Sequence, residues 1–582
     1  MPRQEYFREI IEAIKSKKLA KEKLSKLKAR LCKKHGLVQP PTDIEILLNA
    51  DKKDVPKLKR FLQTKPARTA SGVSVVAIMT KPIRCPHGAC IMCPSMVEKG
   101  IPQSYTGKEP ATRRAIRNLF DPYLQVFNRL EQYAVSGHSF DKIELIIMGG
   151  TFPSFPGKYR EEFVTYALKA LNDFSRMFFS REGEFDFVEF KKFFELPGDL
   201  GDAERTKKIQ QRLLKLKNKQ KNRHKTAHKQ KTARKQKTTL KNEQGYNEKK
   251  SRIKCVGLTI ETRSDYGKLK QGNEMLRLGC TRVELGIQSV YDEALKKIER
   301  GHTAKDNIEA IRILKDLGFK LNFHYMPGLP GISRKKDFRG MLQLFLDENY
   351  RPDMLKIYPC MVVKHSKLYR QWKKGKFRPL TTMQAAKMIA EFKQFVPPYC
   401  RIMRVQRDIP TYATEAGVGM TNLRQLIHEI MKKRRIRCSC IRCREIGRAE
   451  KPVNGRKEIR TMHYLASGGN EFFISAEIGD CIAGFCRLRF PSACLRKEIT
   501  ESSALVRELH VYGPAVMIGK KGRVQHTGVG RALLATAENI ARQYYKDKIV
   551  VISGVGARGY YRKLGYRSEG PYMVKKIKPI FS

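Results

Sequence analysis

The sequence predicts an α/β protein with a basic helical segment, then a parallel sheet that is closed or partly closed, then a smaller mixed α/β domain. Apolar strand candidates alternate with helix-length segments through the middle of the chain, which is typical of parallel sheets. After about Leu465, several strand candidates follow one another before a single helix. A length of 582 residues suggests several domains, which we place at 1–70, 71–395, 396–464 and 465–582.

Residues 1–70 are expected to form a small helical module that binds nucleic acid. Apolar residues recur at helical spacing with bases between them, and the Pro40–Pro41 pair ends the pattern. A solvated helical face is the alternative, but the excess of bases favours contact with phosphates. The apolar positions are Ile10, Ile11, Ile14, Leu19, Leu24, Leu27 and Leu31.

The region 71–395 alternates strands and helices, beginning with the strand-like Val73–Met79 and including a helix over Thr303–Leu317. Functional groups of such a sheet gather at the carboxyl ends of its strands. Residues 203–252 form a basic insertion with few apolar residues, which we expect to be disordered or loosely helical, a solvated loop. The other strand candidates are Ile143–Met148, Cys255–Ile260, Arg282–Ile287, Leu321–Met326 and Met354–Tyr358.

The region 465–582 predicts a mixed sheet with one main helix, Gly530–Tyr545, and a short final helix. The segment 396–464 before it reads as a basic linker. The strand candidates of this domain are Glu471–Ala476, Ile482–Phe490, Ala504–Val511 and Ile549–Ser553.

The formal net charge of +60 points to a polyanionic partner, nucleic acid before a membrane surface. Heat adaptation would enrich both signs of charge, so it does not explain the excess. The start of the chain lacks an apolar signal region, and no stretch reaches the roughly 18 apolar residues of a membrane span. We therefore expect an intracellular, cytoplasmic protein whose clustered cysteines bind metal rather than form disulfides.

Cys85, Cys90 and Cys93 lie on the loop after the first strand candidate. Three thiolates leave a tetrahedral zinc site incomplete, whereas a [4Fe–4S] cluster held by three thiolates keeps one iron open. A zinc knuckle with His87 as the fourth ligand fits the spacing equally well. Spacing alone therefore predicts a metal centre without choosing between the two.

A series of motifs separates these alternatives: CPHGACIMCP, QSYTGKEPATRRAIRNLFDPY, MGGTFPSFP, CVGLTIETRSDY, VELGIQSVYD, HYMPGLPG and LKIYP. In this order they resemble radical S-adenosylmethionine (SAM) enzymes, and specifically the catalytic subunit of Elongator, over about residues 68–582. The resemblance implies a partial (β/α) barrel, a [4Fe–4S] cluster on the three cysteines, and SAM. It assigns SAM contacts to Gly149, Gly150, Thr151, Glu284 and Gln288.

Two features depart from the family pattern. The first gap between the cysteines is shorter than in the eukaryotic relatives, and Ser264 stands where the family usually has proline. The cysteine spacing suits a single-subunit, archaeal-type member, and neither change removes a ligand.

A glycine loop, QHTGVGR, precedes the main C-terminal helix, where backbone N–H groups could cradle a pyrophosphate. Together with VVISGVG and ARGYYRKLGY it resembles a GNAT-type acetyltransferase, which implies acetyl-CoA. The resemblance assigns contacts to Lys142 and to Tyr561, which could protonate the leaving thiolate, with Tyr560 beside it. The other implied contacts are Glu508, Leu509, His510, Val511, Gln525, Gly528, Val529, Gly530 and Arg531.

A second cysteine cluster, RCSCIRC, contains Cys438, Cys440 and Cys443. Three sulfurs and one histidine would close a structural zinc site, for which His510 or His463 could be the fourth ligand. Free thiols and a second iron–sulfur cluster are the alternatives.

The resemblance implies that an adenosyl radical activates the methyl group of acetyl-CoA, which then adds to C5 of the wobble uridine in a tRNA anticodon stem-loop. Thioester hydrolysis would leave a carboxymethyl group. A protein lysine N-acetyltransferase is the second hypothesis, and a tRNA-binding scaffold with decayed cofactor sites is the third. The first hypothesis needs an electron donor; a homodimer and association with other Elongator-type subunits are left open.

Overall fold

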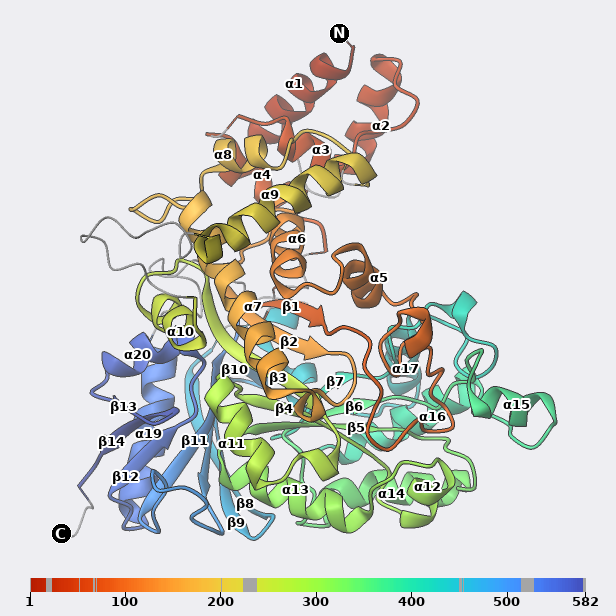
Figure 1. The fold of residues 1–582 in the computed structure, drawn as a ribbon, viewed down its shortest axis with the longest axis vertical. Helices are drawn as coiled ribbons and strands as arrows, with labels where there is room; N and C mark the ends of the chain where they lie inside the picture. Colours follow the sequence, from red (N-terminus) through yellow and green to blue (C-terminus); the bar gives the residue numbers. More distant parts are fainter. Residues whose placement is uncertain are drawn as a thin grey trace.

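Two sheets organise the chain, and in the part that the structure describes each has seven strands (Figure 1). The computed structural model describes residues 2–16, 23–51, 53–65, 69, 71–199, 201–222, 238–449, 453, 455–513 and 528–578. The strands of the first sheet are β1 Ser74–Met79, β2 Lys142–Met148, β3 Lys254–Thr262, β4 Arg282–Gln288, β5 Lys320–Tyr325, β6 Met354–Ile357 and β7 Arg401–Arg404.

The first sheet is a half-barrel in which strands follow one another in sequence order and every neighbouring pair is parallel. Side chains of β2 alternate: Ile143, Leu145 and Ile147 are fully buried in the main hydrophobic core. Lys142 and Met148, on the other face of β2, are partly exposed in the barrel interior. The parallel barrel predicted from the strand–helix alternation is confirmed.

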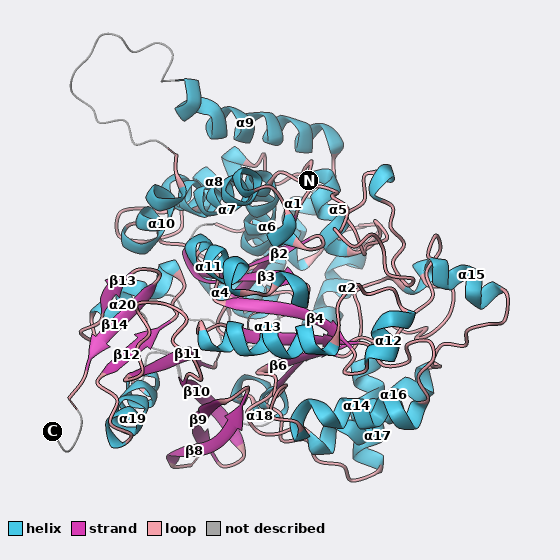
Figure 2. Ribbon diagram, turned by 60° about the horizontal axis from the view of Figure 1, so that its bottom comes forward, coloured by secondary structure: helices cyan, strands magenta, loops and turns pink. Residues whose placement is uncertain are grey.

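Helices cover the outer face of this half-barrel (Figure 2). Residues just before the helices cap their N-termini. Asp121 accepts hydrogen bonds from the backbone N–H groups of Tyr123 and Leu124, and Thr303 forms a capping box with Asp306. The helices are α6 Pro122–Val135, α7 Gly157–Phe178, α11 Leu269–Leu278, α12 Asp292–Lys297, α13 Ala304–Asp316, α14 Arg334–Leu346 and α16 Thr382–Phe392, while α15 Lys367–Lys373 lies farther out, beside the loop of Cys85, Cys90 and Cys93.

The segment 396–464, expected to be a linker, contributes to both sheets. It supplies β7, the last strand of the half-barrel, and β8, which is an edge strand of the second sheet. β7 has the sequence RIMR, too short and too basic to be recognised as a strand from its apolar residues. The bounds of the other elements in this segment are α17 Leu423–Lys433, α18 Ile441–Arg444 and β8 Lys457–Ala466.

The second sheet is mixed, as predicted: β11 pairs antiparallel with β10 and parallel with β12. One main helix packs on it, and three strands that the sequence had not indicated extend it: β8 at one edge, and Arg567–Glu569 and Tyr572–Lys576 at the other. Its other elements are β9 Gly469–Ile478, β10 Cys481–Phe490, β11 Ser503–Val511, α19 Val529–Gln543, β12 Lys548–Val551, α20 Arg558–Arg562, β13 Arg567–Glu569 and β14 Tyr572–Lys576.

The N-terminal module is helical, as predicted, and its apolar stripe is buried. Tyr6, Ile10 and Ile14 pack inside it, while the predicted apolar position Leu19 lies outside the described residues. Its helices are α1 Pro2–Lys15, α2 Leu24–Lys34, α3 Asp43–Leu48 and α4 Val55–Leu62, and α5 Pro110–Arg117 follows β1.

The described ends of the basic insertion are helical, which is one of the two expected states, but they pack on the protein rather than form a solvated loop. Its two ends form α9 Ala203–Asn222 and α10 Leu240–Lys249, and residues 223–237 between them lie outside the described residues. Ile209 and Leu213 of α9, one turn apart, are buried, and Leu214 and Leu216 pack against the core while partly exposed. Arg205 adds a buried ion pair to Glu131 of α6, 2.5 Å between Nη2 and Oε1.

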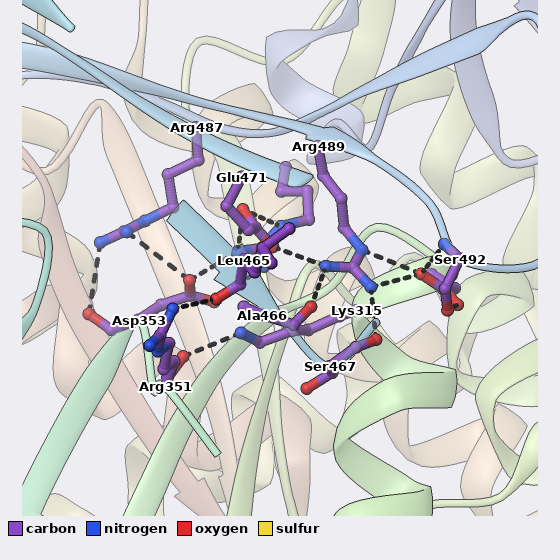
Figure 3. Close-up of polar contacts among 12 residues, drawn as sticks. Lys315, Arg351, Asp353, Leu465, Ala466, Ser467, Glu471, Arg487, Arg489 and Ser492 are labelled. Atoms are coloured by element: carbon purple, nitrogen blue, oxygen red, sulfur yellow. Dashed lines mark hydrogen bonds and ion pairs between the residues drawn. The ribbon is translucent and has the colours of Figure 1, made fainter. Parts of the chain in front are cut away.

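Three arginines of the second sheet are fully buried where it meets the half-barrel (Figure 3). Arg489 donates from Nε and Nη2 to Asp316 Oδ1 at 2.9 and 2.6 Å, and Arg487 lies 3.5 Å from Asp353. Asp353 immediately precedes β6, so the second sheet covers the amino ends of the barrel strands. Within the described residues, each helix is too short or too polar to cross a bilayer.

Candidate active site

A cavity of about 230 Å³ opens at the carboxyl ends of the barrel strands. The parallel register brings side chains from distant motifs to this one end, as the sequence predicted. Its wall includes Cys85, Cys90, Cys93, Tyr105, Gly150, Thr151, Glu261, Glu284, Gln288, Arg300, His324, Lys356, Tyr358, Arg404 and Arg407.

The three cysteines of the first loop are buried, and their spread suits a cluster better than a single ion. Sulfurs around one zinc at about 2.3 Å each lie roughly 4 Å apart. Among the described residues, two groups have three or more ligand atoms within 4.8 Å of one another, and the Cys85, Cys90 and Cys93 trio is not one of them. His87 Nε2 approaches only Cys90 Sγ, at 3.3 Å. The three sulfurs therefore do not form a compact single-ion site as they stand, and the [4Fe–4S] cluster stays a prediction.

Polar groups surround the thiol sulfurs. Gln103 Nε2 donates to Cys93 Sγ at 3.3 Å, and Arg300 Nη1 donates to Cys90 Sγ at 3.6 Å. Burial raises the pKa of the Cys93 thiol, so a thiolate there needs a metal or donors to offset desolvation. Such hydrogen bonds to ligand sulfurs tune the reduction potential of iron–sulfur clusters.

Gly149 and Gly150 follow β2 with φ of +121° and +114°. A Cβ on Gly149 would lie 2.3 Å from Thr80 Oγ1, so this turn requires glycine. It brings Thr151 Oγ1 within 3.6 Å of Cys85 Sγ. At the carboxyl end of β4, Gln288 has φ of +63°, and its Oε1 is buried without a hydrogen-bond partner among the described residues. An orphaned acceptor on a cavity wall is what a site for a polar cofactor would leave.

Four ionisable side chains that the sequence reasoning missed or only partly assigned meet in the cavity: Glu261, Glu284, His324 and Lys356. His324 Nε2 lies 2.9 Å from Glu284 Oε2, and Lys356 Nζ donates to the same oxygen. Tyr105 donates its hydroxyl to Glu261 Oε2 at 3.3 Å. All four stand near the carboxyl ends of strands inside quoted motifs, which is the signal that could have identified them.

The pKa values of Glu284, Glu261 and His324 are shifted in different directions, so these side chains differ in charge at neutral pH. Burial alone would raise the pKa of Glu284, but the Lys356 ammonium and His324 outweigh it and hold that pKa well below its usual range. Burial raises the pKa of Glu261 to about 7, which the charge of Lys356 only partly offsets. Burial lowers the pKa of His324 to about 4. At neutral pH the cavity therefore holds a Glu284–Lys356 ion pair, a neutral imidazole and a carboxyl near its midpoint.

Lys142 stands at the amino end of β2, while Gly149 to Thr151 follow its carboxyl end. Six strand steps at about 3.3 Å separate Lys142 from Met148 by roughly 20 Å. Both share the inner face of β2, and Met148 lines the cavity. Burial lowers the pKa of Lys142. Below the cavity, Glu144 Oε1 pairs with Arg282 Nη2 at 2.9 Å across the barrel interior.

The residues implied for acetyl-CoA lie at the end of β11 and the start of α19. Leu509, His510 and Val511 are partly exposed, whereas Glu508 is buried and accepts from Arg487 Nε at 3.0 Å. Gly528 has φ of +86° and precedes Val529, Gly530 and Arg531 at the helix start. Gln525 lies outside the described residues.

The two tyrosines of α20 occupy different environments. A Cβ on Gly530 would lie 3.0 Å from the Tyr560 hydroxyl, so this half-exposed side chain reaches the start of α19. Tyr561 is buried in the core of the C-terminal domain, with its ring 5.7 Å from that of Tyr566.

The sulfurs of Cys438, Cys440 and Cys443 lie within 4.8 Å of one another, which fits a single tetrahedral ion. Lys393 Nζ approaches Cys438 Sγ at 3.3 Å and Cys443 Sγ at 3.4 Å. Among the described residues neither His510 nor His463 lies in this group, and the fourth ligand stays a prediction. His510 Nε2 lies 3.0 Å from Ser71 O, and His463 Nε2 lies 2.8 Å from Asn470 Oδ1.

Comparison with known proteins covers nearly the whole chain. Family models match for the ELP3 N-terminal domain over residues 3–70, the Radical SAM superfamily over 81–345, the Radical_SAM C-terminal domain over 352–433 and the Acetyltransferase (GNAT) family over 441–566.

Curated relatives match at full length. The tRNA uridine(34) acetyltransferase of Methanocaldococcus infernus is 39% identical over 576 residues, covering 96% of each chain. Elongator complex protein 3 of Homo sapiens is 37% identical over 572 residues, covering 95% of this chain and 93% of its own. The solved archaeal Methanocaldococcus infernus Elp3 with an N-terminus deletion is 36% identical, has a TM-score of 0.68, and matches over 88% of this chain and 100% of its own.

Proposed function

Because the chain belongs to the Elp3 family of radical SAM and GNAT proteins, we propose that it carboxymethylates C5 of the wobble uridine of tRNA. SAM and acetyl-CoA would be the co-substrates. The observation that carries the proposal is the inner face of β2, which runs from Lys142 at the amino end of the strand, the end of the barrel that the second sheet covers, to Met148 in the cysteine-lined cavity. The barrel interior would thus connect the cysteine-lined cavity with the C-terminal domain.

Cys85, Cys90 and Cys93 would hold a [4Fe–4S] cluster, and Gly149 to Thr151 with Glu284 and Gln288 would hold SAM. The spread of the thiols, the orphaned Gln288 oxygen and the glycine turn support this assignment. When bound, the cluster and SAM together supply an adenosyl radical. The buried thiols and strand ends of the cavity wall would limit its contact with water.

The ionisable group in the cavity would position the reactants and handle protons. The Glu284–Lys356 ion pair fixes both side chains and leaves the ammonium facing the cavity, where it would stabilise negative charge on a bound substrate. Glu261, with a pKa of about 7, holds or releases a proton near neutral pH. These two properties suit a reaction in which C5 of a uracil ring gains a substituent and loses a hydrogen.

Acetyl-CoA would bind along the end of β11 with its pyrophosphate at the start of α19, where backbone N–H groups and Arg531 face it. The acetyl group would enter the barrel past Lys142. Tyr561 would then donate a proton to the thiolate that leaves on hydrolysis.

The tRNA would bind through phosphate contacts along the basic surface. The net charge of +60 and the basic helices α2 and α9 support this part of the proposal. A base inside the barrel must leave its stack, and anticodon loops offer unpaired bases that are easily turned outward.

Cys438, Cys440 and Cys443 would bind a structural zinc between the half-barrel and the C-terminal sheet. Lys393, which donates towards two of these sulfurs, comes from the barrel side, and α18 contacts both β7 and β10. Such a site stabilises the region that joins the two sheets. Its fourth ligand is not assigned.

The experiment is anaerobic incubation of the reconstituted full-length protein with SAM, dithionite, acetyl-CoA and bulk tRNA, followed by nucleoside mass spectrometry. The expected product is 5-carboxymethyluridine at position 34, absent with the Cys90→Ser variant. Acetylated lysine with unchanged uridine would instead support a protein acetyltransferase. Tight tRNA binding without any product would support a scaffold.

A further inference from the structure

A basic segment covers the outer side of the cysteine loop. Residues 364–378, which we call the α15 surface, contain seven Lys and Arg and no Asp or Glu. The chain's single tryptophan, Trp372, stands among them and packs beside Tyr369, 5.8 Å between ring centroids. The exposed bases are Lys364, Lys367, Arg370, Lys373, Lys374, Lys376 and Arg378.

The α15 surface is in direct contact with the loop that holds the three cysteines. The backbone N–H of Leu368 donates to the carbonyl of Ile91, which lies between Cys90 and Cys93, at 2.8 Å. Leu368 and Phe377 belong to the same buried apolar cluster as Cys90 and Cys93. Tyr369 and Trp372 pack against that cluster from outside. A short path of packed and hydrogen-bonded atoms therefore joins these aromatic rings to the cysteine loop.

This surface lies away from the substrate side of the loop. The cavity wall in the described chain includes the three cysteines but no residue between 361 and 381. In Figures 1 and 2 α15 is the outermost element on the right, on the side opposite β12, β13 and β14 of the C-terminal domain. The cysteine loop thus has one side facing the cavity and another side covered by α15.

We infer that the α15 surface is the docking site of an acidic one-electron carrier protein of the ferredoxin or flavodoxin type. The inference rests on the proposed radical chemistry, because that chemistry consumes one electron per SAM cleaved. The electron leaves the carrier, reduces the cluster, and is spent in breaking the bond between sulfur and C5′ of SAM, which releases methionine. A carrier on this face would deliver the electron without obstructing the cavity.

Charge favours this partner over others. Clustered bases steer an acidic protein into the correct orientation and raise its association rate about 10- to 1,000-fold at low salt. The Tyr369–Trp372 pair, which lies among these bases in the sequence, offers the kind of apolar contact found at the core of protein interfaces. A tRNA would also be attracted by the bases, so the experiment must separate the two.

The test variant carries Arg370→Gln, Lys373→Gln, Lys374→Gln and Lys376→Gln, all at exposed positions. The matched control removes four exposed charges from the C-terminal domain: Lys563→Gln, Arg567→Gln, Lys576→Gln and Lys578→Gln. Binding of an acidic ferredoxin that lacks tryptophan is followed by Trp372 fluorescence, and cluster reduction by stopped-flow absorbance. Release of 5′-deoxyadenosine with dithionite checks the radical chemistry separately.

We expect the test variant to lower the second-order rate constant for reduction by the ferredoxin at least about tenfold and to flatten its salt dependence. The control variant, reduction by dithionite and tRNA affinity should be unchanged. Equal ferredoxin rates in the test and control variants would overturn the inference. A loss of tRNA affinity in the test variant would assign the surface to nucleic acid instead. Failure of dithionite itself to release 5′-deoxyadenosine would refute the proposed function, whatever the docking result.

Discussion

Arg507 of β11 and Asp353, the residue before β6, form two parallel hydrogen bonds across the interface of the two sheets. Nη1 donates to Oδ2 at 2.8 Å and Nη2 donates to Oδ1 at 2.6 Å, and both side chains are fully buried. Arg487 approaches the same carboxylate. Planar two-pronged pairs are directional, so this contact fixes the angle at which the C-terminal sheet meets the barrel.

Asp353→Asn should therefore destabilise the protein strongly. The substitution removes the negative charge that faces the buried guanidinium groups of Arg487 and Arg507. Losing one partner of a buried ion pair typically costs about 3–5 kcal/mol of folding free energy. Urea denaturation followed by circular dichroism measures the change. Lys336→Gln, which breaks the exposed pair with Glu293, is the control and should cost less than about 1 kcal/mol. A loss for Asp353→Asn as small as that of the control would contradict the argument.

The buried side chain of Lys315 should make the free energy of unfolding rise with pH. Burial lowers its pKa in the folded protein to about 7, against about 10.4 in an unfolded chain. Between these values the unfolded state binds more protons, so the free energy of unfolding increases by up to about 1.4 kcal/mol per pH unit. Lys315→Met should remove this part of the slope between pH 7 and 10 in urea titrations. Lys305→Met, at an exposed position of the same helix, should keep the wild-type slope.

Arg300 should raise the reduction potential of a cluster bound to the cysteine loop. Its guanidinium donates to Cys90 Sγ at 3.6 Å and to Gly286 O at 2.8 Å, and positive donors at sulfur favour the reduced state. Arg300→Met should lower the potential by about 50–100 mV, which corresponds to roughly 1–2 kcal/mol for one electron. A redox titration followed by electron paramagnetic resonance measures it. Exposed Arg334→Met serves as the control, and an equal potential in both variants would count against this role of Arg300.

Tyr561→Phe should impair the reaction of acetyl-CoA without destabilising the protein. The ring keeps its packing in the C-terminal core, while the hydroxyl that would protonate the leaving thiolate is lost. The rate of free CoA release during tRNA modification should fall about 100-fold with the melting temperature unchanged. Tyr560→Phe tests the half-exposed neighbour and should have the smaller effect. The reverse order would move the proton donor to Tyr560.

Cys440→Ser should remove zinc without removing iron. The Cys438, Cys440 and Cys443 site needs each sulfur to close the coordination sphere, whereas the cysteine loop at 85–93 is separate. Metal analysis should show about one zinc lost per chain, and the melting temperature should fall because the metal stabilises only the folded state. Cys494→Ser, an exposed and isolated thiol, is the control. Unchanged zinc content in Cys440→Ser would exclude the proposed site.

Much of the site was predictable because its signals are local. The cysteine loop is one short stretch of sequence, and so is the glycine turn after β2. The residues at each carboxyl strand end likewise lie next to the strand that carries them. The parallel order of the strands then brings them together without further information. β7 was missed because its four residues carry two arginines, and α9 was misjudged because three or four apolar residues suffice to pack a basic helix.

By itself the sequence determined the half-barrel, the mixed C-terminal sheet, the helical N-terminal module and the position of the cysteine loop. Periodicity and short motifs encode these features, since they depend on neighbours along the chain. Only the tertiary structure decided that Glu261, His324 and Lys356 meet Glu284, and that Asp353 meets Arg507. Those contacts join residues far apart in sequence, and strand register and the packing of two sheets set them, which no local pattern records.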